Sequence, residues 1–160
     1  LISNFPPGVA DEGLIFEPLI TVHSHFVVSA KHPLANKNDV SMADLQEHHL
    51  ALVGQAHVSV LVADLFAAEN LTLLKPAIET NSLVLLRSLV QSNGYVSLLP
   101  EHLLEQDVKD GRIVPLAMEG TPFKRSSGLI LRGLETQRPA VKHFVDATRA
   151  VFADWPEVSA

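Results

Sequence analysis

The sequence contains no cysteine, so it has no disulfide framework, no thiolate zinc site and no cysteine nucleophile. No stretch approaches the roughly 18 consecutive apolar residues of a transmembrane helix. Basic residues are also few, with 12 Lys and Arg against 18 Asp and Glu and a net charge of −6. Because such a chain has no overall attraction for a polyanion, we expect it not to bind DNA or RNA by itself. These absences favour a cytoplasmic protein with no membrane partner.

The sequence likewise lacks the short motifs that mark catalytic and cofactor sites. It has no Gly-x-Ser-x-Gly elbow, no glycine-rich phosphate loop and no His-Glu-x-x-His pair. Its Asp and Glu residues are scattered, without an evident acid and base pair. We therefore predict that the protein is not an enzyme and that it uses no cofactor.

The overall composition of the sequence is typical of a globular protein. The 160 residues are 47% hydrophobic, which is too apolar for intrinsic disorder, and the length suits one domain or two small lobes. The first residue is Leu1 and not Met, and residues 1–8 (LISNFPPG) read like the end of a strand that runs into a loop. They lack the basic and apolar regions of a signal peptide. We expect this sequence to begin in the middle of a domain.

Strand-like and helix-like segments alternate along the chain, which predicts an α/β fold with a parallel or mixed sheet. β-branched and aromatic residues predict the strands, and helical spacing with capping residues predicts the helices. The expected strands are 14–21, 25–30, 50–53, 76–79, 95–99, 113–116 and 128–131. The expected helices are 42–47, 58–69, 83–91, 100–110 and 139–152, and residues 119–127 are expected to form a polar loop.

Several short motifs follow one another in an order that is known from one protein family. An apolar strand is followed by HPLA and then by a Ser-x-x-Asp-Leu segment, and further motifs surround the expected helix at 83–91. Together they resemble the effector-binding domain of LysR-type transcriptional regulators over about residues 17–152. The motifs are HPLA (32–35), SMADL (41–45), ETNS (79–82), NGYVSLLP (93–100), GRIV (111–114) and PAVKHF (139–144).

The resemblance implies a two-lobed, periplasmic-binding-protein-like (type II) α/β architecture, with a ligand in the cleft between the lobes and two crossover strands as the hinge. Residues 22–128 would form one complete lobe, and residues 1–21 and 129–160 would form part of the other. The implied function is effector sensing: a small carboxylate-bearing or aromatic metabolite shifts the lobes within a homodimer or homotetramer and so controls transcription. DNA would be bound only through an N-terminal helix-turn-helix domain, which this sequence does not include. The helices at 58–69 and 139–152 are candidate oligomer contacts.

A second hypothesis is a solute-binding receptor of a transport system, which has the same two-lobe fold. A secretion signal upstream of Leu1 would favour the receptor, whereas a helix-turn-helix pattern there would favour the regulator. A small enzyme on a related fold is a third possibility, and it would require a titratable pair in the cleft.

Thr80, Asn81 and Ser82 are the first candidate ligand-binding residues, because they lie where an expected strand gives way to a helix. Unpaired backbone N–H groups at a helix start attract carboxylates and other anions, and the hydroxyl and amide side chains add hydrogen bonds. The same residue types also cap helices in proteins of every kind. Ligand contact and simple capping both remain open for these three residues.

Three further candidates lie in the same expected lobe. Gln55 and His57 belong to the loop between the strand at 50–53 and the next helix, and ligands in open α/β sheets bind near such strand ends. They could equally be polar surface residues. Tyr95 opens the strand at 95–99, where its ring could stack on an aromatic effector or pack at the edge of the lobe.

His23 and Ser24 are candidates because they lie at the expected first crossover between the lobes. His23 and His25 would project to the same side of a strand. This pair has no carboxylate or thiolate beside it in the sequence, so we predict no metal site. A pH-sensitive or ligand-contacting hinge fits these residues better, and ordinary polar hinge residues fit better still.

Overall fold

The computed structural model describes residues 2–4, 14–54, 56–92, 94–119, 123–132 and 138–153. The chain divides into two compact units. Unit 1 consists of Leu1–His23 and Phe123–Ala160, and unit 2 consists of Ser24–Pro122. That these units are the two lobes expected above stays a prediction. In the described ranges, no helix is both long enough and apolar enough to cross a membrane.

One long strand, β2 (Leu14–Ser29), contributes residues to both units. The sequence predicted two strands there, and that prediction was wrong because both halves of β2 have pairing partners. The N-terminal half is a neighbour of β7 (Phe123–Arg132), and the C-terminal half pairs antiparallel with β5 (Ser97–Pro100) and β6 (Ile113–Pro115). The pairing of Ser24 with Pro100 carries the strand through the polar residues that suggested a break.

Unit 1 consists of a small sheet and the helix α5 (Pro139–Ala153). The sheet order is β1–β7–β2, and β1 (Ile2–Asn4) pairs antiparallel with β7. The polar loop expected at residues 119–127 was wrong in its second half, because β7 begins at Phe123. There the neighbouring strands supply hydrogen bonds that the polar side chains do not predict. The core residues are Leu129, Leu131 and Val145, with Leu19 packed against them.

Gly128 sets how closely β7 and β2 approach each other. A Cβ atom at this position would lie 2.0 Å from the carbonyl oxygen of Glu17 and 2.8 Å from Cα of Pro18. Both contacts are with backbone atoms, which cannot rotate away as a side chain can. Only glycine therefore permits this approach.

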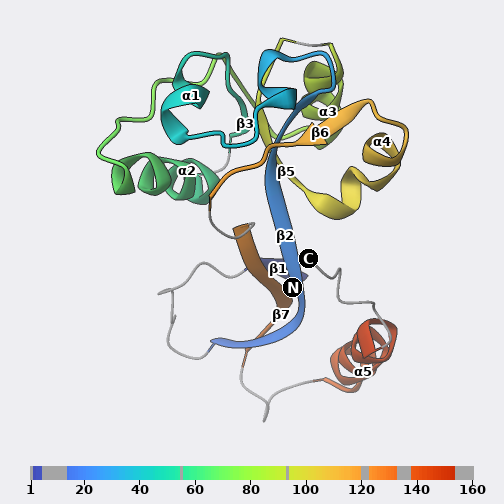
Figure 1. The fold of residues 1–160 in the computed structure, drawn as a ribbon. Coiled ribbons are helices and arrows are strands. Elements are labelled where there is room, and N and C mark those ends of the chain that lie inside the picture. Colours follow the sequence, from blue (N-terminus) through green and yellow to red (C-terminus); the bar gives the residue numbers. More distant parts are fainter. Residues whose placement is uncertain are drawn as a thin grey trace. The chain divides into compact units, whose positions relative to one another are not determined.

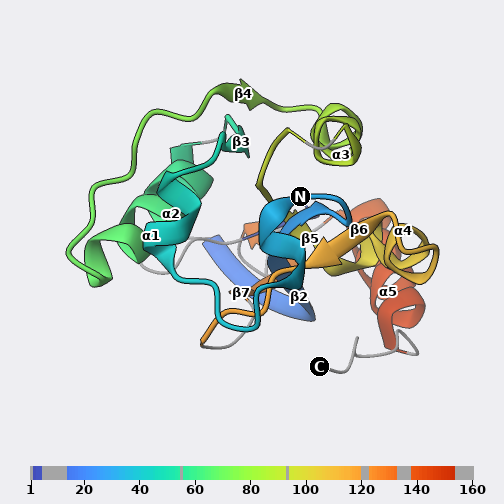
Figure 2. The same cartoon turned by 45° about the horizontal axis from the view of Figure 1, so that its top comes forward.

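Unit 2 contains a second, parallel sheet that is covered by helices. Ala51 pairs with Ile78 and Val53 with Thr80, and an isolated parallel bridge joins Leu50 to Val96. In Figure 2 this two-stranded sheet lies between the helices α2 and α3. The elements are η1 (Pro33–Asn36), α1 (Met42–Gln46), β3 (Ala51–Val53), α2 (Ala56–Ala68), β4 (Ile78–Thr80), α3 (Leu83–Gln91), η2 (Glu101–Leu103) and α4 (Glu105–Lys109), labelled in part in Figure 1.

Capping residues set the helix starts in unit 2. Ser41 Oγ accepts a hydrogen bond from the N–H of Asp44 at 3.2 Å, and the Asp44 side chain bonds back to the Ser41 N–H, which is a capping box. His32 caps η1 through its ring. The helix expected from Pro100 onward was wrong at its start, because Pro100 has extended backbone angles and pairs with Ser24 as the last residue of β5.

The core of unit 2 lies between its sheets and helices. Leu86 and Val90 of α3 are buried there, which fits the apolar spacing of that helix. The other buried members are Val27, Ala51, Leu99, Leu104 and Ile113.

Candidate functional site

The carboxyl ends of β3 and β4 bring Gly54 together with Thr80 and Asn81. The N–H of Gly54 donates a hydrogen bond to the Thr80 carbonyl at 3.2 Å. The Asn81 Oδ1 atom lies 3.6 Å from the position that a Cβ on Gly54 would take. The parallel pairing of Val53 with Thr80 explains this arrangement, because both strands end at the same edge.

Ser82 is the N-cap of α3, so the capping interpretation of this residue is confirmed. Its Oγ accepts a hydrogen bond from the N–H of Leu85 at 3.2 Å, and its own N–H donates to Thr80 Oγ1 at 3.2 Å. Among the described residues, the N–H groups of Leu83 and Val84 find no acceptor. The exposed start of α3 therefore keeps two backbone donors and the positive end of the helix dipole for an anion.

Two of the expected site residues cannot be placed. Gln55 lies outside the described residues. His57 belongs to α2, and its side chain also lies outside the described part of the structure.

Tyr95 lies at the other end of β3 from Thr80. It precedes Val96, which bridges to Leu50, and its ring centroid is 6.2 Å from that of His49. The side chain is half-buried and packs against the core of unit 2. The structure therefore does not bring Tyr95 together with the start of α3.

His23, Ser24 and His25 are consecutive residues of β2, so Ser24 lies on one face of the strand and the two histidines on the other. Ser24 is buried and is the first residue of unit 2. His25 Nε2 is 3.5 Å from Glu101 Oε2. In the described ranges, no group of three or more His, Cys, Asp or Glu side chains could hold a metal ion.

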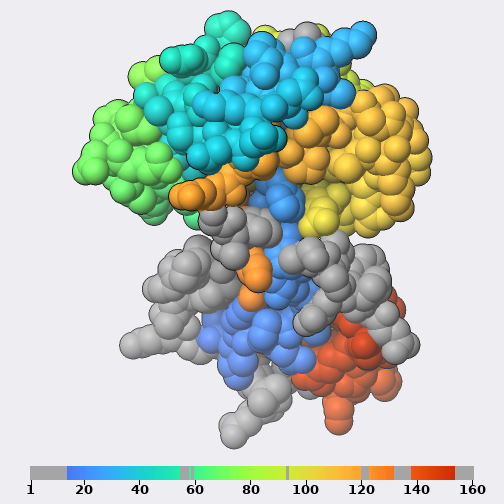
Figure 3. All heavy atoms as spheres, in the orientation of Figure 1, coloured from blue at the N-terminus to red at the C-terminus, as the bar shows by residue number. Residues whose placement is uncertain are grey.

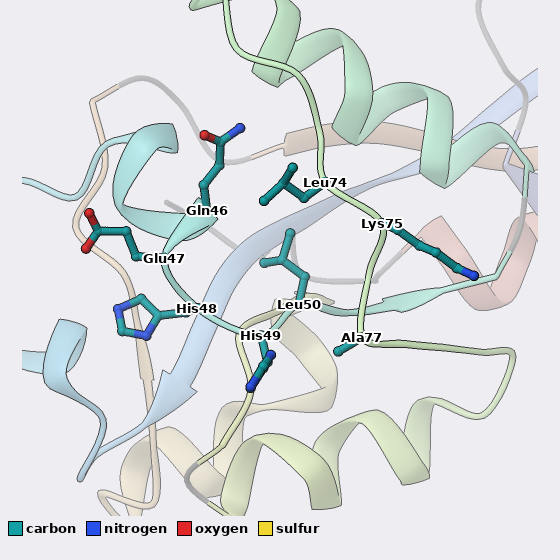
Figure 4. A pocket seen from close by; sticks show the side chains of 8 residues that line it. All are labelled: Gln46, Glu47, His48, His49, Leu50, Leu74, Lys75 and Ala77. Carbon is teal, nitrogen blue, oxygen red and sulfur yellow. The ribbon is translucent and has the colours of Figure 1, made fainter.

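A pocket of about 210 Å³ opens in unit 2 at the amino end of β3. In Figure 4, His48 and Lys75 extend to opposite sides of it, and Leu50 and Leu74 lie between them. None of the expected ligand-binding residues lines this pocket, and it lies at the other end of β3 from Thr80. Its lining residues are Gln46, Glu47, His48, His49, Leu50, Leu74, Lys75 and Ala77.

Unit 2 also contains a buried carboxylate that sequence reasoning missed. Asp107 is fully buried and accepts hydrogen bonds from Arg87 of α3, from Gln91 at 2.8 Å and from Arg112 at 3.0 Å. The bonds from Arg87, and after them those from Arg112, lower the pKa of Asp107, although burial opposes them. No motif marks this residue, because its partners lie 20 residues before and 5 residues after it.

A buried histidine lies close to the pocket. His32 is 4% exposed, its Nδ1 accepts the N–H of Leu34 at 3.2 Å, and its ring meets that of His48 edge-on with the centroids 4.6 Å apart. Burial lowers the pKa of His32, and the charge of His48 adds to the effect. The lowered pKa favours the neutral form of His32, in which Nδ1 accepts the Leu34 N–H.

The comparisons with known proteins come from a family model and from solved structures. The family model described as the LysR substrate binding domain matches residues 1–153. A comparison with curated proteins gave no significant match.

Several solved regulatory domains have a similar fold. The CcmR regulatory domain of Synechocystis PCC6803, solved in complex with 2-PG, is 20% identical with a TM-score of 0.76, over 97% of this chain and 74% of that one. A mutant form of the MetR regulatory domain (NMB2055) of N. meningitidis is 20% identical with a TM-score of 0.77, over 99% and 74% of the two chains. The effector-binding domain of QuiR, solved with shikimate, is 19% identical with a TM-score of 0.74, over 96% and 71%.

These likenesses confirm the expected fold class, a mixed α/β fold of the periplasmic-binding-protein-like kind. The family match covers nearly the whole chain, including the start of α3 and the long strand β2. This chain therefore belongs to the LysR substrate-binding domain family, whose members are ligand-sensing regulatory domains.

Proposed function

We propose that this chain senses a small carboxylate-bearing metabolite through the start of α3. The observation that carries the proposal is the exposed helix start at Thr80–Ser82, where the N–H groups of Leu83 and Val84 have no acceptor among the described residues. Ligands in open α/β folds bind beyond the carboxyl ends of strands, and an anion is favoured at a helix N-terminus. Relatives that were solved with 2-PG and with shikimate support a small-molecule ligand.

The other expected contacts remain part of this proposal. Gln55, His57, His23 and Ser24 are proposed to contact the ligand, from the loop after β3 and from β2. The packing of Tyr95 beside His49 supports a structural role for Tyr95 more than stacking on a ligand.

The proposed output is transcriptional. A ligand that binds one arrangement of the domain more tightly than another shifts the balance between them, and equal binding to both would signal nothing.

We propose that the domain acts in the cytoplasm within a homodimer or homotetramer, and that a separate helix-turn-helix domain binds the DNA. Val141, Phe144 and Val151 of α5, the helix drawn in red in Figure 3, are exposed apolar residues, and they support α5 as a candidate oligomer contact. Because the family consists of regulators, neither an enzyme nor a transport receptor is proposed.

The proposal is tested by screening small carboxylates and aromatic metabolites for thermal stabilisation of the chain, followed by calorimetric titration of each hit. The test variant is Ser82→Ala, and the control is Ser41→Ala, because both serines are N-caps. Loss of either cap costs about 1 kcal/mol of stability. We expect Ser82→Ala to weaken binding of a hit about tenfold and Ser41→Ala to leave its affinity within about twofold.

Two results would contradict the proposal. One is that no small carboxylate or aromatic metabolite stabilises the chain. The other is that a hit binds Ser82→Ala and Ser41→Ala with equal affinity, because the start of α3 would then be a cap and nothing more.

A further inference from the structure

The pocket at the amino end of β3 is formed by unit 2 alone and lies apart from the start of α3. Its volume is about 210 Å³, below the roughly 300–1,000 Å³ of pockets that hold drug-sized ligands, so it suits a small metabolite. Residues 46–50, which lead from α1 into β3, form one wall, and residues 74–77, which lead into β4, form the other. All of them belong to unit 2, so the pocket needs no residue of unit 1.

Hydrogen bonds join the two walls of this pocket at two points. The Gln46 side chain donates from Nε2 to the Thr72 carbonyl at 2.6 Å. The Leu50 carbonyl accepts the N–H of Ala77 at 2.9 Å, just before β4 begins. The walls are therefore fixed by groups that belong to both segments, and the pocket is part of the folded unit.

The middle of the pocket is apolar. Leu50 is 4% exposed, and Leu74 on the opposite wall is 58% exposed. Figure 4 shows the two leucines beside each other in the middle of the lining. Covering exposed apolar surface with an apolar group is favourable, so this part of the pocket suits a short chain of methylene groups.

Opposite charges flank the two leucines. In Figure 4, Glu47 and Lys75 lie on opposite sides of them. Both side chains are exposed, and neither makes an ion pair within the described part of the chain, whereas Lys37 and Asp44 nearby in the sequence are paired at 2.6 Å. No internal partner holds Glu47 or Lys75, so both can turn toward a bound molecule.

We propose that this pocket binds a small ω-amino acid, a molecule with an ammonium group at one end, a carboxylate at the other and a short apolar chain between them. The ammonium group pairs with Glu47, the carboxylate pairs with Lys75, and the methylene groups cover Leu50 and Leu74. An α-amino acid fits less well, because both of its charges are attached to one carbon. This second ligand site is separate from the site of the proposed function, and the inference does not depend on it.

The test uses the full 160-residue chain and three ω-amino acids of increasing length, γ-aminobutyrate, δ-aminovalerate and ε-aminocaproate. Valerate lacks the ammonium group, pentylamine lacks the carboxylate, and norvaline has both charges at one end, so these three are the matched control compounds. Calorimetric titration at constant ionic strength measures the affinity. The NMR signals of the His48 and His49 rings show whether a compound occupies this pocket, because both histidines line it.

We expect at least one ω-amino acid to bind saturably with about millimolar affinity and to shift both histidine signals. The control compounds should bind at least threefold more weakly, which is the size of effect that one exposed ion pair supplies. Glu47→Gln and Lys75→Gln should each weaken binding about threefold. Glu105→Gln and Lys109→Gln are the control variants, because these exposed residues of α4 pair with each other, and both should leave the affinity within about 1.5-fold.

The apolar contact has a test of its own. Leu74→Ala should weaken binding about threefold, because methylene groups lose their contact with the pocket wall. Leu103→Ala, which shortens another exposed leucine of unit 2, should leave the affinity unchanged.

Four results would overturn the inference. The first is that none of the three ω-amino acids binds saturably. The second is that valerate, pentylamine or norvaline binds as tightly as the best of them. The third is that Glu47→Gln and Lys75→Gln bind like the control variants, and the fourth is binding that leaves the His48 and His49 signals unchanged, which would place the ligand elsewhere on the chain.

Discussion

Asp107 connects three parts of unit 2 through one buried carboxylate. Its oxygens accept hydrogen bonds from Arg87 and Gln91 on α3 and from Arg112 just before β6, and Asp107 itself lies in α4. A buried charge of this kind contributes little net stability compared with an apolar core, but removing one partner leaves the others uncompensated. The partner arginines are half-exposed and can be rehydrated, which limits that cost.

Asp107→Asn is expected to lower the free energy of unfolding by about 3 kcal/mol, because two guanidinium groups lose their counter-charge. Asp110→Asn is the control, since Asp110 makes an exposed pair with Arg112, and it should cost less than about 1 kcal/mol. Urea unfolding measures both. Equal losses in the two variants would contradict the special role of the buried carboxylate.

The lowered pKa of Asp107 predicts that the free energy of unfolding depends on pH in the acid range. The pKa of Asp107 is lowered in the folded chain, so the unfolded chain binds a proton first as the pH falls. The stabilisation is therefore complete above the ordinary Asp pKa of about 4 and is lost at lower pH. Wild type should lose more stability between pH 5 and pH 3 than Asp107→Asn does, and parallel pH profiles of the two would refute this.

The lowered pKa of His32 predicts a second dependence of stability on pH, in a higher pH range. Its pKa is lowered by burial and by His48, so the unfolded chain takes up a proton before the folded chain does. This stability is complete above the ordinary His pKa of about 6.5 and is lost as the pH falls below it. His32→Asn keeps a capping acceptor without a titrating ring and should flatten the decline in melting temperature between pH 7 and pH 5. His102→Gln, on the exposed η2, is the control and should leave that decline unchanged.

The contact between β7 and β2 depends on a residue without a side chain. Gly128→Ala places a Cβ 2.0 Å from the carbonyl oxygen of Glu17, so the two strands must separate. We expect a loss of about 3 kcal/mol or more in the free energy of unfolding. At Gly94 a Cβ meets nothing within 4 Å, so Gly94→Ala should change stability by less than about 0.5 kcal/mol. Similar melting temperatures for the two variants would show that β7 and β2 tolerate a wider spacing.

The sequence predicted elements well where local signals decide them. Ser82 and the apolar spacing after it predicted the helix over Leu83–Gln91 with its observed bounds. Prediction failed where partners distant in the sequence decide the structure. The polar pair His23 and Ser24 suggested a break in a strand that β5 continues, and residues 123–127 suggested a loop that β1 and β2 hold as a strand.

In the candidate site too, local sequence signals could be predicted and contacts between residues distant in the sequence could not. The start of α3 could be predicted, because a strand, three capping residues and an apolar helix are adjacent in the sequence. The buried carboxylate of Asp107 could not, because its partners lie 20 residues before and 5 residues after it in the sequence. The position of Tyr95 at the amino end of β3 likewise depends on the bridge between Leu50 and Val96.

At the scale of the whole molecule, the net charge and the family both favour a chain that binds a small ligand and does not itself bind DNA. A net charge of −6 gives no general attraction for a nucleic acid, and the family is that of the substrate-binding domain. In a gel-shift experiment at about 0.15 M salt, this chain alone is expected to leave an operator fragment unshifted at micromolar concentration. A tight, specific shift would contradict the proposal that DNA is bound by a separate domain.

Because β2 contributes residues to both units, the amides of this one strand report on the stability of each unit. Its amides up to His23 belong to unit 1, and those from Ser24 onward belong to unit 2. Exchange of these amides with deuterated solvent reports the local opening free energy of whichever unit holds them. A substitution that loosens one unit alone, such as Gly128→Ala, should therefore speed exchange along one half of the strand and leave the other half slow. A single labelled peptide then shows whether the two units open independently or together.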